Sequence, residues 1–64
     1  MNDIYHEGLR ILITEKDGIM TGQVTGRYDG SVKMVHLNVK DYNIEDVIKV
    51  MQKNIDAFWK WKYG

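Results

Sequence analysis

The chain has 64 residues, with nine lysines and arginines, nine aspartates and glutamates, and no cysteine. A chain of this length forms one domain, and folding buries only about 60% of the surface that the unfolded chain exposes. The absence of cysteine excludes disulfides and thiolate metal sites, and a formal net charge of zero lacks the basic character typical of nucleic-acid-binding domains. A core this small usually needs an additional source of stability. We therefore expect the protein to associate with a second copy.

The sequence gives no indication of a membrane span or a signal peptide. The longest apolar run is Ile11 to Ile13, whereas a transmembrane helix needs about 20 apolar residues. The first residues, MNDIYHEGLR, lack the basic and apolar regions of a signal peptide. We therefore expect a cytoplasmic protein without membrane association, organised as a single domain over residues 1–64.

Two Asp-Gly pairs divide the first two thirds of the chain. Asp17-Gly18 and Asp29-Gly30 each lie between runs rich in Ile, Val, Thr and Tyr. Such pairs favour two-residue hairpin turns, because both central residues adopt positive φ angles that Asp and Gly tolerate. The spacing predicts three strands, over about residues 8–16, 19–28 and 31–40.

The two predicted turns agree on which residues face the core. Counting from the first turn places Ile11 opposite Val24 and Ile13 opposite Gly22, while the second places Val24 opposite Val35. Both hairpins therefore select one face. Its members are Leu9, Ile11, Ile13, Met20, Gly22, Val24, Gly26, Val35, Leu37 and Val39.

The remainder of the chain predicts one amphipathic helix over about residues 44–62. Asn43 is a preferred N-cap, and Asp46 can return its hydrogen bond in a capping box. The apolar side chains recur at helical spacing and form a stripe that would cover the sheet. The stripe comprises Ile44, Val47, Ile48, Met51, Ile55, Phe58 and Trp59. The predicted fold is α+β: a three-stranded antiparallel β-meander packed on one face by a C-terminal amphipathic α-helix.

Two glycines interrupt the predicted central strand. Glycine weakens a strand unless a neighbouring group must approach closely. We expect Gly22 and Gly26 to make room for one or two of the aromatic rings that the helix supplies, those of Phe58, Trp59 and Trp61. The alternative is a β-bulge at one of the two glycines.

A second, narrower apolar stripe adjoins the first on the helix. It consists of Val50, Ala57 and Trp61, and one three-stranded sheet cannot cover both stripes. We expect these three residues to mediate self-association. The alternative is that the N-terminal segment around Ile4 and Tyr5 folds over them.

No pattern of residues indicates catalysis, a cofactor or a metal centre. His6 and His36 lie on different segments, and Ser31 is the only serine and belongs to no nucleophile or phosphate-binding motif. A protein metal site needs three or four convergent ligands. We therefore expect a non-enzymatic protein without a cofactor.

The face of the predicted sheet away from the helix carries side chains that can read base edges. These are Arg10, Gln23, Thr25, Arg27 and Asn38. The sequence thus supports two hypotheses from different classes. The first is a homodimeric interaction module that binds another, unidentified macromolecule, and the second is a DNA-binding module that uses this sheet face, which the zero net charge disfavours.

Overall fold

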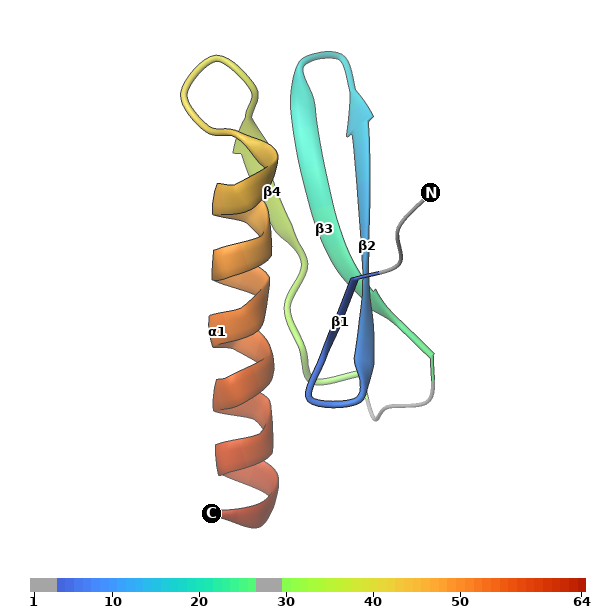
Figure 1. Ribbon diagram of the computed structural model, residues 1–64, viewed down its shortest axis with the longest axis vertical. Coiled ribbons are helices and arrows are strands. Elements are labelled where there is room, and N and C mark those ends of the chain that lie inside the picture. Colours follow the sequence, from blue (N-terminus) through green and yellow to red (C-terminus); the bar gives the residue numbers. More distant parts are fainter. Residues whose placement is uncertain (1–3, 27–29) are drawn as a thin grey trace.

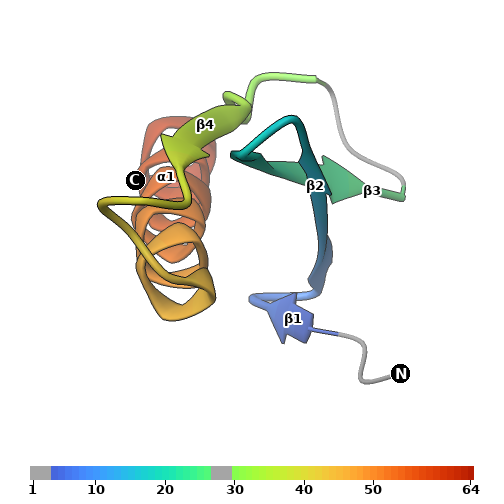
Figure 2. The same cartoon turned by 90° about the horizontal axis from the view of Figure 1, so that it is seen from above.

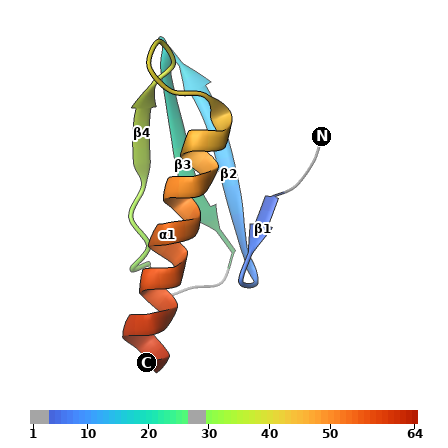
Figure 3. The same cartoon turned by 60° about the vertical axis from the view of Figure 1, so that its left-hand side comes forward.

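The computed structural model describes residues 4–26 and 30–64 and has an α+β fold with four antiparallel strands and one helix (Figure 1). The elements are β1 (Ile4–His6), β2 (Leu9–Lys16), β3 (Ile19–Thr25), β4 (Val35–Asn38) and α1 (Ile44–Tyr63). The strands follow the order β1-β2-β3-β4 in one sheet. Figure 2 shows α1 on the concave side of the curved sheet, and Figure 3 shows it running along the length of the strands. The predicted packing of the helix on one sheet face is confirmed.

The prediction of three strands is wrong, because β1 adds a fourth. A two-residue turn at Glu7 and Gly8, with φ of 51° and 83°, connects β1 to β2, and His6 pairs with Leu9 across it. Glutamate is uncommon at positive φ, so this turn lacks the sequence signal that Asp-Gly provides. A strand of three residues is also too short to show a periodic pattern.

The hairpin between β2 and β3 forms as predicted. Asp17 and Gly18 have φ of 53° and 79°, as a two-residue turn of this type requires. Ile11 pairs with Val24, and Ile13 pairs with Gly22.

The predicted register between β3 and β4 is wrong by two residues. Gly22 pairs with Val35, and not with Leu37, which pairs with Met20. A shift of two residues leaves every side chain on its predicted face, because side chains alternate with a period of two. Of the predicted Asp29-Gly30 turn, Asp29 lies outside the described residues.

The residues directly before β4 lie outside the sheet, and this explains why the predicted β3–β4 register is wrong. The pairing of β3 with β4 ends at Gly22 and Val35, whereas β4 was expected to begin near residue 31. Alternation along the predicted strand over residues 31–40 places Val32 on the outer face, but it is 7% exposed and belongs to the core. Burying Val32 between the sheet and α1 shortens the strand but adds apolar contact to a small core.

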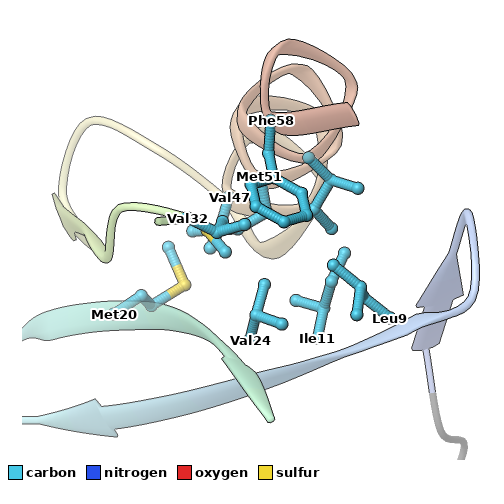
Figure 4. Close-up of a cluster of buried hydrophobic side chains, with 9 residues drawn as sticks. Leu9, Ile11, Met20, Val24, Val32, Val47, Met51 and Phe58 are labelled. Carbon is cyan, nitrogen blue, oxygen red and sulfur yellow. The ribbon is translucent and has the colours of Figure 1, made fainter. Parts of the chain in front are cut away.

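The core lies between the concave face of the sheet and one side of α1 (Figure 4). Its buried members are Leu9, Ile11, Met20, Val24, Val32, Val47, Met51, Ile55 and Phe58. From the predicted helix stripe, Ile48 and Trp59 are half-buried and Ile44 is exposed. The part of α1 that is buried against the sheet is therefore narrower than the apolar stripe predicted from the sequence.

The prediction that aromatic rings pack above the two glycines is wrong. The predicted close packing of the helix at Gly22 is confirmed. A Cβ atom at Gly22 would lie 2.8 Å from both Val47 Cγ1 and Met51 Cγ, so aliphatic side chains of α1 occupy this space. Gly26 has a φ of 111°, and a Cβ there would meet none of the described atoms within 4 Å. Its role is conformational, since other residues rarely adopt that angle.

The predicted capping box begins α1. The Asp46 N–H donates to Asn43 Oδ1 at 3.1 Å, and the Asn43 N–H donates to Asp46 Oδ2 at 2.9 Å. These bonds satisfy amide groups that have no acceptor within the helix.

The cap makes a testable contribution to stability. Asn43→Ala should lower the free energy of unfolding by about 1 kcal/mol, because the Asp46 amide loses its side-chain acceptor and keeps only the contact with the Asn43 carbonyl. Chemical denaturation measures this loss. Asn43→Ser, which keeps an acceptor oxygen, serves as the matched control and should remain close to the parent. Equal losses in the two variants would contradict the assigned role.

Candidate interaction surfaces

One flank of α1 exposes the three residues predicted for self-association. Val50 is 36% exposed, Ala57 is exposed and Trp61 is 71% exposed. Asn54 lies between them, so that positions 50, 54, 57 and 61 are separated by four, three and four residues. This spacing is that of the contact seam of paired helices. We call Val50, Asn54, Ala57 and Trp61 the helix flank.

A groove of about 300 Å³ runs beside the C-terminal half of this flank. Asn54, Ala57, Phe58 and Trp61 line it from α1, and Ser31 and Lys33 line it from the segment before β4. The predictions placed Ser31 and Lys33 in a strand and therefore missed their position beside the helix. Phe58 supplies a buried aromatic surface, while Trp61 projects at the rim.

Charge is distributed unevenly along α1. Glu45 and Asp46 occupy the first turn, and Lys60 and Lys62 occupy the last. Each pair has the sign that the helix dipole stabilises at its end. The helix therefore presents an acidic N-terminal end and a basic C-terminal end.

The described residues of the N-terminal segment, from Ile4 onward, do not cover the helix flank, so the alternative that the segment around Ile4 and Tyr5 folds over it is wrong. β1 pairs with β2 at the sheet edge opposite β4, and Tyr5 is 62% exposed. Figure 2 shows β1 and β4 at opposite edges of the curved sheet. The helix flank lies beside the segment that precedes β4, and no other described segment of the chain covers it.

The convex face of the sheet carries four of the five candidate nucleic-acid contacts and brings three of them close together. Strand pairing aligns Tyr5, Arg10 and Thr25 in one row across the sheet. Gln23 lies two residues along β3 from Thr25, and Asn38 lies at the far end of the face, paired with Ile19. The fifth candidate, Arg27, lies outside the described residues.

The described strand residues of this face are locally basic. They comprise Tyr5, Arg10, Leu12, Thr14, Lys16, Ile19, Thr21, Gln23, Thr25, His36 and Asn38. Two carry positive charge and no member carries a carboxylate, although the chain as a whole has no net charge. His36 is exposed, and its Nδ1 lies 3.0 Å from Thr21 Oγ1.

The other histidine has a contact that the sequence did not indicate. His6 Nε2 lies 2.7 Å from Asp56 Oδ1, which joins β1 to the middle of α1. The carboxylate of Glu7 lies close to both groups. His6 and Glu7 are adjacent in sequence, but Asp56 lies 50 positions after His6 and meets them only through the fold.

The described part of α1 is not apolar enough to cross a membrane. No protein-family model, curated protein or solved structure matches the chain.

Proposed function

We propose that the protein is a non-catalytic interaction module that forms a homodimer through the helix flank. The observation that carries the proposal is the exposure of Trp61, whose side chain stands 71% exposed at the rim of an apolar groove. Tryptophan in such a position is typical of residues that dominate the energy of an interface.

The spacing of the flank supports a second helix as the occupant. Positions 50, 54, 57 and 61 form the seam along which two helices pack side by side. Ala57 is small and permits a close approach of the two backbones. Asn54, near the centre of the seam, supplies an amide that can donate and accept hydrogen bonds across the seam.

The distribution of charge supports a second copy of this chain in antiparallel orientation. Antiparallel pairing brings the acidic first turn of one helix, at Glu45 and Asp46, beside the basic last turn of the other, at Lys60 and Lys62. The two helix dipoles also oppose one another favourably. A parallel pair would place like charges together at both ends.

A twofold axis near Asn54 satisfies these conditions. It places Val50 of one copy opposite Ala57 of the other, beside the groove, and it repeats the same contact on the other side of the axis. A patch that is complementary to itself in this way generates a closed dimer. The interface area is limited to one helix flank and its groove, so we expect association in the micromolar range.

Sedimentation velocity over a range of protein concentrations tests the proposal. The sedimentation coefficient should rise from that of a monomer to that of a dimer between low micromolar and millimolar concentration. Association should also weaken as salt concentration rises, because the charges at the helix ends are exposed. A strict monomer at millimolar concentration would overturn the proposal.

The convex sheet face supports nucleic-acid binding as a second candidate function. Arg10 and Lys16 on a face without carboxylates among its described strand residues offer contacts to phosphate, and Tyr5 offers a stacking surface beside Arg10. The formal net charge of zero argues for weak binding.

Fluorescence titration with mixed-sequence duplex and single-stranded DNA tests this candidate. Binding at low salt that weakens steeply as salt rises, and that is lost in Arg10→Gln, would support it. Absence of binding to both probes at low salt would exclude it.

A further inference from the structure

His6, Glu7 and Asp56 form a cluster at the junction of β1 and α1. One ligand atom from each side chain lies within 4.8 Å of the other two, and His6 Nε2 and Asp56 Oδ1 are 2.7 Å apart. The exposed fractions of the His6 and Asp56 side chains are 23% and 59%, so the cluster is open to solvent on one side.

The turn at Glu7 and the packing of α1 beside β1 bring these three side chains together. Successive residues in a strand point to opposite faces, which separates the side chains of most neighbouring pairs. Glu7, however, is a turn residue with a φ of 51°, and this conformation allows its carboxylate to lie on the same side of the chain as the His6 ring. Asp56 approaches from α1, on the side of the helix that faces β1.

We propose that this cluster is a binding site for a divalent transition metal ion, with Zn²⁺ as the probe. One imidazole nitrogen and two carboxylate oxygens are suitable ligands for Zn²⁺, and solvent water completes an open site. A neutral histidine with two carboxylates carries two negative charges, which match the charge of the ion. The imidazole ligand favours Zn²⁺ over Mg²⁺ or Ca²⁺, which prefer oxygen ligands alone.

The distances require only a small adjustment of the side chains. Bonds of about 2.0 to 2.2 Å around a tetrahedral ion place neighbouring ligand atoms roughly 3.3 to 3.6 Å apart. The His6–Asp56 distance of 2.7 Å must therefore increase slightly as the ion replaces the direct contact. The Glu7 carboxylate must move toward the other two groups, and its exposed position permits this.

The consequence of binding is a cross-link between the two ends of the chain. β1 is held to the rest of the sheet by three residue pairs, and the His6 contact ties it to α1. Metal bound to the folded state alone raises stability, and structural metals commonly supplement small cores.

Isothermal titration calorimetry with ZnCl₂ on the full chain tests the site, together with thermal unfolding. The parent should bind one Zn²⁺ per chain, and its Tm should rise by on the order of 10 °C at a hundredfold excess over Kd. His6→Gln and Asp56→Asn should each weaken binding at least about tenfold, since each removes a ligand. Both substitutions keep hydrogen-bonding groups, and the Tm measured without metal reports any change in folding.

His36→Gln is the matched control, because His36 is the other histidine of the chain and touches Thr21 rather than a carboxylate. It should leave Zn²⁺ affinity unchanged. Trp61→Ala should leave it unchanged as well, since the site does not depend on the proposed dimer. Absence of Zn²⁺ binding in the parent, undiminished binding in His6→Gln, or one ion per two chains would overturn the proposal.

Discussion

Gly22→Val should lower the free energy of unfolding by about 1 to 3 kcal/mol, although valine has a far higher strand propensity than glycine. The new Cβ would lie 2.8 Å from Val47 Cγ1 and from Met51 Cγ. Both side chains are fully buried and surrounded by other core residues, so they have no free space into which to move. For a small domain this loss is a large share of the total stability. Urea denaturation of the two proteins measures it.

Thr14→Val provides the matched control. Thr14 is an exposed residue of β2 on the convex face, opposite Thr21, and the substitution introduces the same valine side chain into a strand without contact to α1. Its stability should remain within about 0.5 kcal/mol of the parent. A Gly22→Val protein as stable as Thr14→Val would contradict the close packing of α1 on the central strand.

Trp61→Ala should weaken homodimerisation at least about thirtyfold, while the monomer keeps its fold. The indole is 71% exposed in the monomer, so its removal uncovers little of the core. Its intramolecular ring contact is with Phe58, at a centroid distance of 6.3 Å. Sedimentation velocity measures the association, and circular dichroism with thermal unfolding measures the fold.

Tyr63→Ala separates a specific contact from a general loss of exposed aromatic surface. Tyr63 is 74% exposed, close to the value for Trp61, but it stacks on Trp59 at 5.4 Å and lies outside the helix flank. It should dimerise as the parent does. If both variants weaken association equally, the helix flank is not the interface.

The sequence predicted α1 and the β2–β3 hairpin well, because each has a strong local signal. Asn43 and Asp46 determine where α1 begins through hydrogen bonds that span only three residues. Asp17-Gly18 determines the β2–β3 register through the backbone angles of two adjacent residues. Such features need no information from distant parts of the chain.

The errors arise where tertiary contacts prevail over local pattern. The Asp29-Gly30 pair predicts a tight hairpin, but burial of Val32 against the core takes the segment before β4 out of the sheet. The shift is by two residues and so preserves the faces: Leu37 pairs with Met20 instead of the predicted Gly22, but its side chain stays on the predicted face. At Gly22 the sequence indicated a close approach without specifying whether Met51 or a ring would fill it.

The candidate surfaces were predictable to different degrees. Val50, Ala57 and Trp61 follow from helical spacing, and the structure leaves all three exposed on one flank. The groove beside them depends on where residues 31–33 lie, which only the fold determines. The cluster at His6 depends on a turn at Glu7 and on a helix residue 50 positions later, so no spacing in the sequence indicates it.

Disulfide cross-linking at Asn54 tests antiparallel pairing of the helix flanks most directly. The chain has no cysteine, so a single introduced thiol reports only on its own position. Antiparallel pairing of the helix flanks places Asn54 beside the twofold axis. There the Cα atoms of the two copies of residue 54 approach within disulfide range. Under mild oxidation Asn54→Cys should form a covalent dimer rapidly. Lys49→Cys, on the exposed side of α1 away from the flank, should remain largely monomeric. Equal yields for the two variants, or faster cross-linking at position 49, would contradict the proposed interface.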